Sequence, residues 1–440
     1  MDTKTVKIGL VGFGTVGSGV ARILQENGRD IADQTGIRLE LACVVDKDIT
    51  TPRVVSLAPG VLTDDLQRLL DDKSIDIVIE LVGGTTFARD LVLKILGAGK
   101  HVVTANKALL AEHGGEMYRA ALAVGRCIAF EASCCGGIPI VSALRTGLAA
   151  NDISALYGIF NGTCNYILSE MTGSGAAFDD VLKAAQQKGF AEADPTLDID
   201  GTDTAHKLAI LAALAFGCRV EMEDISIEGI QNVQIEDIRY AQELGYVLKL
   251  LAVGEKDADG RVSLRVHPSF LSQGTPLADV GGPFNAVSVF GNAVGNVMFY
   301  GRGAGMMATA SAVVADIIDI ALGTSERLFE RMPMVTERRK PANFKKIGDI
   351  QSRFYIRIMA KDQPGVFARY GRILGKHSIS ISGAMQHEGA GPENTVPVII
   401  TTHPTRQKNM TAALKELQSP DILLGTPVCI HILDIPEDKE

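Results

Sequence analysis

Three glycines near the N-terminus constrain the fold of this chain more than any other feature. Residues 6–11 form an apolar, β-rich run, Gly12-x-Gly14-x-x-Gly17 follows at once, and apolar residues then recur at helical spacing. Strand, tight turn and helix in this order predict a dinucleotide-binding unit. Gly12 permits the turn, Gly14 lets the backbone approach a pyrophosphate, and Gly17 lets the helix pack on the strand. The residues between these glycines, which we expect to complete the cofactor-binding turn, are Phe13, Thr15 and Val16.

The order of the expected elements divides the chain into domains. Strands expected at 39–45, 75–82 and 101–104 alternate with helical patterns, which predicts an α/β fold with a Rossmann-type, doubly wound parallel sheet over 1–150. We expect residues of about 305–330 to complete this domain. Irregular strand spacing predicts an α+β substrate and dimerisation domain over 151–304. Residues 331–349 are expected to form a charged linker, and 350–440 a separate βαββαβ module.

Composition narrows the class of partner. The net charge of −9 disfavours a nonspecific nucleic-acid or anionic-membrane surface, so small molecules are the expected ligands. The N-terminus lacks the pattern of a secretory signal. Seven cysteines without a C-x-x-C pair fit reduced thiols better than disulfides or a zinc site, which makes the cytoplasm the expected compartment.

The second expected strand ends in Asp46, a position from which a carboxylate can accept hydrogen bonds from the adenosine ribose hydroxyls. Such a carboxylate favours NAD over NADP because it repels a 2′-phosphate. Lys47 beside it could have the opposite effect. The sequence supports nearly as well the alternative that Asp46 and Lys47 are solvated turn residues.

Two lysines carry the expected chemistry. Lys107 follows the strand expected at 101–104, at the rim where open α/β sheets bind ligands. Lys207 follows a segment rich in carboxylates, and Asp203, four residues earlier, would share its helix face. This pair serves either surface stability or catalysis. The segment lacks the ligand pattern of an EF-hand calcium loop, and a site for a cationic substrate group is the more natural interpretation.

Cys134 and Cys135 lie in a glycine-rich turn after an apolar strand. A thiolate there could attack an aldehyde, as in acylating dehydrogenases. However, no base or activating group is visible nearby in the sequence, and a free cysteine is usually a small buried hydrophobe. We therefore expect these two thiols to be structural.

Several long motifs, in order along the whole chain, resemble the homoserine dehydrogenase family. They are GFGTVG from Gly12, VTANK ending at Lys107, FEASCCGGIPI, NGTCNYIL at 161–168, GFAEADPTLDIDGTDTAHKLAIL, and GRGAG at 301–305. In addition, KDQPGV at 361–366 resembles the strand-to-helix turn of an ACT domain, a ferredoxin-like module that binds amino acids at its subunit interfaces.

The resemblance implies the reversible NAD(P)-dependent reduction of L-aspartate 4-semialdehyde to L-homoserine, and it implies roles for particular residues. Lys207 would be the general acid–base and Lys107 would help to hold the carbonyl group and the nicotinamide. Glu192 and Asp198 would bind the ammonium and hydroxyl groups of the substrate. Asp203 would contact the substrate and orient Lys207.

The resemblance further implies a monovalent cation, usually sodium in this family, and a close approach of Gly303 to the cofactor. The cation ligands transferred by position are Glu131, Cys134, Gly136 and Ile138, with the cysteine contributing only its main-chain oxygen. Many relatives have an arginine after the second strand, where this chain has Asp46-Lys47-Asp48. This difference favours NAD, although NADP stays open.

The family resemblance also suggests regulation and assembly. We expect threonine to act as an effector at the C-terminal module and the chain to form a homo-oligomer, either a dimer or a tetramer. Two other functions remain as alternatives: an acylating semialdehyde dehydrogenase that uses Cys134 or Cys135, and a nucleotide-binding sensor without catalysis. The second alternative leaves Lys107 and Lys207 unexplained.

Overall fold

The computed structural model describes residues 4–332, 342–387, 395–418 and 426–436. The chain forms two compact units, one of residues 1–162, 203–225 and 283–342 and the other of residues 163–202, 226–282 and 343–440. Of the predicted linker 331–349, residues 333–341 lie outside the described residues. The four-part division into domains stays a prediction.

The first unit contains a parallel six-stranded sheet in the order β3-β2-β1-β4-β5-β6, which confirms the predicted Rossmann-type fold. The chain order reverses between β1 and β4, and ligands bind such sheets at that point, outside the carboxyl ends of the strands. The bounds of the strands are β1 (Lys4–Val11), β2 (Ile37–Val45), β3 (Leu62–Thr63), β4 (Ile75–Glu80), β5 (His101–Thr104) and β6 (Ile128–Ala129).

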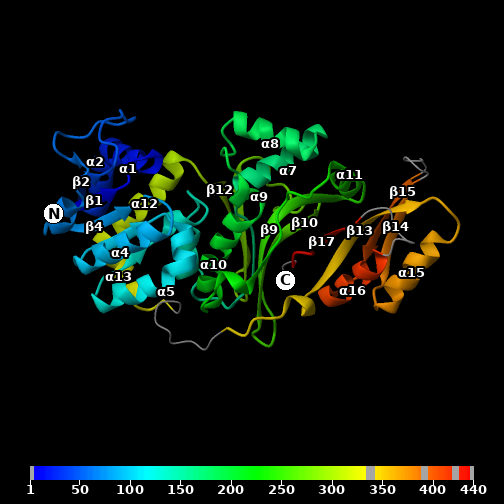
Figure 1. Cartoon of the computed structure of the whole chain (residues 1–440). Coiled ribbons are helices and arrows are strands. Elements are labelled where there is room, and N and C mark those ends of the chain that lie inside the picture. The colour runs from blue at the N-terminus through cyan, green and yellow to red at the C-terminus, as the bar shows by residue number, and fades with distance from the viewer. Residues whose placement is uncertain (1–3, 333–341, 388–394, 419–425, 437–440) are drawn as a thin grey trace. The chain divides into compact units, whose positions relative to one another are not determined.

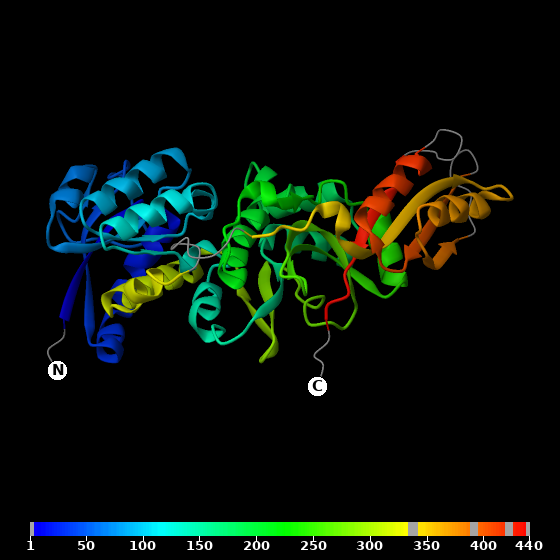
Figure 2. The same cartoon turned by 90° about the horizontal axis from the view of Figure 1, so that it is seen from below.

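Helices cover both faces of this sheet, as a doubly wound fold requires. Helix α12 packs against α1 and α4 packs against α5, and Figure 2 shows α12 (yellow) on the face opposite α4 and α5 (cyan). The helices are α1 (Thr15–Glu26), α2 (Gly28–Thr35), α3 (Leu66–Asp71), α4 (Thr86–Gly97), α5 (Lys107–Ala123), α12 (Met306–Ala321) and α13 (Thr324–Phe329).

The rest of the first unit carries the residues of the expected catalytic site. Its strands pair antiparallel in the order β12-β11-β7, with Ile159 at the end of β7 opposite Ala286. The long apolar helix here, α10, is buried along most of its length. The elements are η1 (Glu131–Ser133), α6 (Ile140–Ser142), η2 (Ala143–Gly147), β7 (Ile153–Ile159), α10 (Thr202–Phe216), η3 (Met222–Asp224), β11 (Phe284–Gly291) and β12 (Gly295–Arg302).

The second unit contains a mixed sheet in the order β9-β10-β17-β13-β15-β14. Its strands are β8 (Ile225–Ile227), β9 (Tyr246–Lys256), β10 (Val262–Ser272), β13 (Gln351–Lys361), β14 (Ile381–Gln386), β15 (Thr395–Thr402), β16 (Thr405–Arg406) and β17 (Val428–Ile432). Its helices are α7 (Gly162–Ser174), α8 (Phe178–Gln187), α9 (Thr196–Ile199), α11 (Ile235–Glu243), η4 (Ile347–Asp349), α15 (Val366–Lys376) and α16 (Gln407–Leu417).

A hydrophobic core joins the two helices of the C-terminal segment to its sheet. Apolar residues of β13 and β15, such as Ile356 and Ile400, pack against Leu374 of α15 and Met410 of α16. Figure 1 shows both helices beside these strands. The element order β13-α15-β14-β15-α16-β17, with the two-residue β16 between β15 and α16, has the pattern expected of the module, whereas its identity as an ACT domain stays a prediction. No helix among the described residues is long and apolar enough to cross a membrane.

Candidate active site

The glycine turn after β1 has the geometry that a dinucleotide requires. Gly12 has a φ of 100°, and a Cβ there would lie 2.5 Å from the Leu81 carbonyl oxygen. A Cβ on Gly17 would lie 2.2 Å from the Gly12 oxygen, whereas one on Gly14 would meet nothing within 4 Å. Gly12 and Gly17 therefore pack closely against the protein backbone, whereas Gly14 leaves space for a ligand to approach the turn. No side chain caps α1, so its N-terminal amide groups can receive a phosphate.

One pocket combines this turn with the ends of two neighbouring strands. Its lining comes from the glycine turn, from the loop after β4 and from the segment after β5: Gly14, Thr15, Val16, Gly17, Glu80, Leu81, Gly83, Gly84, Ala105, Asn106, Lys107 and Ala108. The pocket thus lies at the carboxyl ends of β1, β4 and β5, where the Rossmann-type sheet is expected to bind its ligand. Four of the predicted cofactor residues and Lys107 meet here.

Asp46 is held against the glycine turn. Its Oδ2 accepts a hydrogen bond from the Phe13 amide at 2.5 Å, and its Oδ1 accepts one from the Asp48 amide at 2.9 Å. No sequence pattern pointed to Arg53, whose guanidinium lies 3.8 Å from Asp46 Oδ1 and donates to the Phe13 carbonyl oxygen at 2.9 Å. A carboxylate and an arginine therefore flank the same end of the turn.

The predicted catalytic residues Lys107, Asp203 and Lys207 come together. Lys207 donates from Nζ to Asp203 Oδ2 at 2.6 Å, and Lys107 Nζ lies 3.1 Å from Asp203 Oδ1. Lys207 also donates to the Phe160 carbonyl oxygen at 2.6 Å. Asn161 donates from Nδ2 to Asp203 Oδ2 at 2.8 Å. One carboxylate thus holds two ammonium groups and one carboxamide.

Burial makes this cluster different from a surface ion pair. Asp203 and Lys207 are each 8% exposed, whereas the Lys107 side chain is 35% exposed. Burial acts to raise the pKa of Asp203, but the two lysines outweigh it and hold that pKa below its usual range. Burial acts to lower the pKa of Lys207, but the Asp203 carboxylate outweighs it and the net shift is upward. Lys207 is therefore a charged ammonium at neutral pH.

The Lys207 ammonium retains one hydrogen for another acceptor. An ammonium has three donors, and among the described residues two of them reach the Phe160 oxygen and Asp203 Oδ2. The third has no partner there. A substrate oxygen at this position would receive a hydrogen bond from a group that can also release a proton.

The loop with the two cysteines is buried beside this cluster. Burial raises the pKa of Cys135 to about 11, and it raises the pKa of Cys134 well above its usual range. Both thiols therefore stay protonated at neutral pH, and both are at most 1% exposed. This geometry provides no thiolate for an acylating mechanism, in agreement with the structural role expected from the sequence.

Glu131, the first of the predicted cation ligands, lies under the same loop. Its Oε1 and Oε2 accept hydrogen bonds from the amides of Val141 and Ser142 at 2.8 and 2.7 Å. Burial raises its pKa. The described residues contain no group of three or more His, Cys, Asp or Glu side chains placed to hold a metal ion. A cation here would therefore depend on main-chain oxygens.

The remaining predicted residues lie in two places. Gly303 belongs to the first unit. A Cβ added there would lie 2.0 Å from the Asn285 Nδ2, so packing by itself already requires a glycine at this position. Glu192 is exposed and Asp198 half-buried, and both belong to the second unit. Their contacts with the substrate stay predictions.

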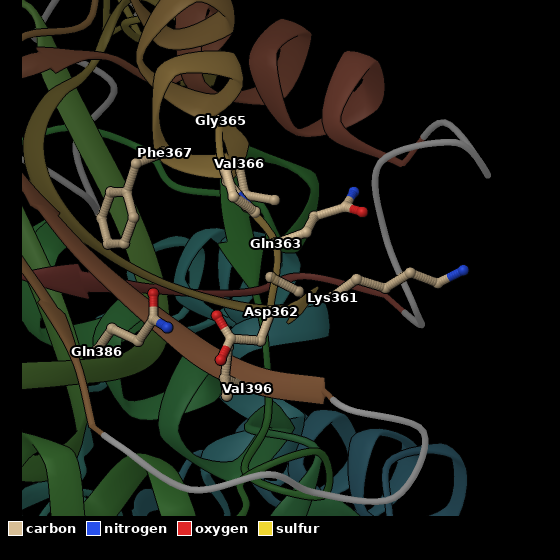
Figure 3. Close-up of a pocket in the computed structure, with 10 residues that line it drawn as sticks. Lys361, Asp362, Gln363, Gly365, Val366, Phe367, Gln386 and Val396 are labelled. Carbon is tan, nitrogen blue, oxygen red and sulfur yellow. The ribbon is translucent and has the colours of Figure 1, made fainter.

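A second pocket lies in the C-terminal segment, at the turn between β13 and α15 (Figure 3). It is lined by residues 360–367 together with Gln386 and Val396. The Asp362 carboxylate and the Gln386 carboxamide face the same space. Gly365 has a φ of 92° and precedes α15, whose N-terminus has no side-chain cap. The pocket thus combines a carboxylate, a carboxamide and the amide groups of a helix end.

Comparisons with known proteins identify the family of this chain. Residues 12–131 match the family described as homoserine dehydrogenase, NAD binding domain, and residues 139–318 match the family described as homoserine dehydrogenase. The homoserine dehydrogenase of Synechocystis sp. is 43% identical over 436 residues, which are 98% of this chain and 100% of that protein. The chain belongs to the homoserine dehydrogenase family.

Solved structures of the family extend the comparison to the fold. A homoserine dehydrogenase from Thiobacillus denitrificans is 42% identical, with a TM-score of 0.87 over 98% of this chain and 99% of that chain. A mutant of a hyperthermophilic archaeal homoserine dehydrogenase, in complex with NADPH, is 29% identical with a TM-score of 0.59, over 72% of this chain and 98% of that chain. Family membership makes the present chain an NAD(P)-dependent oxidoreductase that acts on a CH–OH group.

Proposed function

We propose that Lys207 is the acid–base group with which this chain interconverts L-aspartate 4-semialdehyde and L-homoserine. The single observation that carries the proposal is the third ammonium hydrogen of Lys207, which has no acceptor among the described residues. A nicotinamide cofactor bound at the glycine turn would supply the hydride to the carbonyl carbon in the reduction and accept it in the oxidation. Lys207 gives its proton to the developing alkoxide in the reduction and takes it back in the oxidation.

Lys107 and Asp203 support this step in different ways. Lys107 lines the cofactor pocket and also lies 3.1 Å from Asp203 Oδ1, so it joins the nicotinamide side of the site to the acid–base cluster. Its charge stabilises negative charge on the carbonyl oxygen. Asp203 keeps Lys207 protonated and fixes its direction. Glu192 and Asp198 are proposed to bind the polar groups of the substrate because they lie in the segment GFAEADPTLDIDGTDTAHKLAIL, which resembles a motif of the family.

The cofactor turn is proposed to accept NAD and NADP. Asp46 favours NAD, but both of its oxygens already accept backbone hydrogen bonds and Arg53 lies beside it. A 2′-phosphate would find a cationic partner in Arg53. Substitution Arg53→Gln is therefore expected to lower kcat/KM for NADP about 10-fold and to change kcat/KM for NAD less than about 3-fold. Equal losses for both cofactors would contradict this assignment.

A monovalent cation is proposed at Glu131 and the main-chain oxygens of Cys134, Gly136 and Ile138. The donor set supports a hard cation, because Cys134 keeps its thiol proton and can offer only a carbonyl oxygen. The cation would neutralise a buried carboxylate. It would stabilise the loop beside Lys207, and it takes no part in proton transfer.

Threonine is proposed to bind the pocket of Figure 3. An amino acid needs partners for an ammonium and a carboxylate, and this pocket offers the Asp362 carboxylate and the N-terminal amides of α15. Asp362→Asn is therefore expected to weaken inhibition by threonine about 10-fold. Asp349→Asn, which removes a surface carboxylate paired with Lys408, serves as control. An unchanged inhibition curve in Asp362→Asn would refute this site.

We also propose that the chain works in the cytoplasm as a homo-oligomer, a dimer or a tetramer. Its seven cysteines are all free, and six of them are buried, which supports a reducing compartment. The assembly rests on the predicted ACT module, since such modules bind amino acids at subunit interfaces.

The reaction and the role of Lys207 can be tested with one matched pair of variants. The wild-type chain is expected to form an aldehyde from L-homoserine with NAD or NADP. Lys207→Ala is expected to lose at least about 10³-fold in kcat while its affinity for NADPH, measured by fluorescence, stays within about 3-fold. Lys249→Ala is the control, because Lys249 is another buried lysine that donates to a backbone oxygen. Loss of NADPH affinity with kcat intact would contradict the proposal.

A further inference from the structure

We infer that Asn285 is a positioning residue for proton transfer: its carboxamide fixes the carbonyl oxygen that holds the Lys207 ammonium. Asn285 Nδ2 donates to the Phe160 oxygen at 2.9 Å, and Lys207 Nζ donates to the same oxygen at 2.6 Å. Both lone pairs of that oxygen therefore have donors. This inference rests on the proposed function of Lys207.

The Phe160 carbonyl needs such support because secondary structure does not fix it. Ile159 pairs with Ala286 at the end of the antiparallel ladder, and the chain leaves β7 at Phe160 before α7 begins at Gly162. Asn285 is the residue next to Ala286, so its side chain continues the pairing by one step. The orientation of the acceptor for Lys207 thus depends on one side-chain hydrogen bond.

The surroundings restrict the Asn285 carboxamide to a narrow slot. Asn285 is 1% exposed. A Cβ on Gly303 would lie 2.0 Å from its Nδ2, and a Cβ on Gly162 would lie 3.6 Å from its Oδ1. Gly303 therefore leaves the space that the carboxamide fills, whereas a Cβ on Gly162 would make only an ordinary van der Waals contact with it. Rotation of this group is restricted, so its Nδ2 keeps its direction toward the Phe160 oxygen.

One atom of Asn285 argues against a purely structural role. Its Oδ1 is buried and has no hydrogen-bond partner among the described residues. A buried acceptor without a partner destabilises the fold. The Asn285 side chain also hydrogen-bonds the Cys135 side chain, so the variants below have to separate its action on the Phe160 oxygen from its contact with the cysteine loop.

The position of the Lys207 ammonium controls the rate of proton transfer, because the N–H bond that carries the proton must point at the substrate oxygen. Asp203 attracts Lys207 from one side and the Phe160 oxygen from another. When the Phe160 carbonyl loses its orientation, the third hydrogen of Lys207 no longer points at the substrate oxygen. A small misplacement of a reacting group lowers the rate about 10- to 100-fold.

The test compares Asn285→Ala with Asn165→Ala in the full-length enzyme. Asn165 is a matched control: it is 2% exposed and donates from Nδ2 to the backbone oxygens of Val280 and Gly282. We expect Asn285→Ala to lower kcat for homoserine oxidation about 10- to 100-fold, with KM for NAD and NADP within about 2-fold. We expect Asn165→Ala to lower the melting temperature but to keep kcat within about 3-fold.

Asn285→Asp removes the donor to the Phe160 oxygen with almost no change in side-chain volume. This isosteric variant replaces the donor by a carboxylate that shares the Phe160 oxygen with Lys207, whose titratable neighbours are Asp203, Cys135 and Cys134. The added negative charge favours the ammonium, so the pH at which oxidation reaches half its maximal kcat is expected to rise by about one unit. The new charge moves this midpoint whether or not Asn285 positions the Phe160 carbonyl, so if Asn285→Ala does not fold, the maximal kcat of Asn285→Asp at high pH decides the question: a loss of about 10- to 100-fold is expected.

Two outcomes separate the inference from the function on which it rests. If Lys207→Ala is inactive while Asn285→Ala, or Asn285→Asp at high pH, keeps the maximal kcat within about 2-fold, the inference is wrong and the proposed function stands. If Lys207→Ala keeps its kcat, the proposed function itself fails. Equal loss of kcat in Asn285→Ala and Asn165→Ala would also overturn the inference.

Discussion

Two buried ion pairs in this molecule use the same kinds of groups for different ends. In the first unit Asp203 is shared by Lys207, Lys107 and Asn161. In the second unit Asp237, which is 0% exposed, accepts from Arg357 at 2.6 and 2.9 Å and from the Tyr355 hydroxyl at 3.0 Å.

The difference lies in what remains when one partner is removed. Asp203 has a second cation, and Lys207 keeps one hydrogen without a partner among the described residues. Arg357 is the single cation on Asp237 within ion-pair distance in the described part of the chain, and it also donates to Gln234. The Asp203–Lys207 pair has a donor left that can bind a substrate. In the Asp237–Arg357 pair the donors are used between α11 and β13, so this pair links the two elements. This contrast separates catalytic from structural burial of charge.

The largest expected effect is on activity at the first pair. Lys207→Met should lower kcat by about 10³-fold or more, which is about 4 kcal/mol of transition-state stabilisation. It should change the free energy of unfolding by less than about 1 kcal/mol, because Lys107 and Asn161 still compensate the Asp203 charge. Urea denaturation and steady-state kinetics on the same variant measure both quantities. A severe loss of stability would place Lys207 with the structural pairs.

The second prediction reverses this pattern. Arg357→Met removes the guanidinium from the buried Asp237 carboxylate and leaves the Tyr355 hydroxyl to donate to it. This substitution should destabilise the second unit by about 3–5 kcal/mol. Hydrogen exchange of the β13 amides measures this loss. Below the unfolding transition kcat should stay within about 3-fold of the wild type. Arg357→Lys, which keeps the charge and loses the two-pronged geometry, should lose less stability.

A smaller effect is expected at the second lysine of the catalytic cluster. Lys107→Met removes one of the two charges that stabilise a negative carbonyl oxygen, and kcat should fall about 10- to 100-fold. Lys107 also lines the cofactor pocket, so KM for the cofactor should rise as well. A combined change in kcat and KM, measured by steady-state kinetics, would distinguish it from Lys207. A change in KM alone would show that Lys107 only binds the cofactor.

Local patterns in the sequence were sufficient to predict that Asp203 and Lys207 pair, whereas the catalytic role expected of them came from the family resemblance. Asp203 and Lys207 are four residues apart, which places them on one helix face. The glycine turn predicts a strand before it and a helix after it. Lys107 could be placed at the strand rim for the same reason. These predictions rest on residues close together along the chain.

Residues whose roles depend on distant contacts could not be predicted. Asn285 meets Phe160 across 125 positions, and Arg53 reaches the glycine turn across 40. No spacing rule connects such residues. Strand β12 was also not predicted, because none of its residues is buried and its apolar residues, 297–300, are consecutive and do not alternate with polar ones.

The pH dependence of homoserine oxidation tests the central claim, that Asp203 tunes Lys207 as the proton carrier. In this direction Lys207 must be neutral, so kcat should rise with pH through the alkaline range because the pKa of Lys207 lies above its usual value. Asp203→Asn removes the carboxylate that raises this pKa and should move the midpoint to lower pH by about one unit or more. The same midpoint in the wild type and in Asp203→Asn would contradict the account.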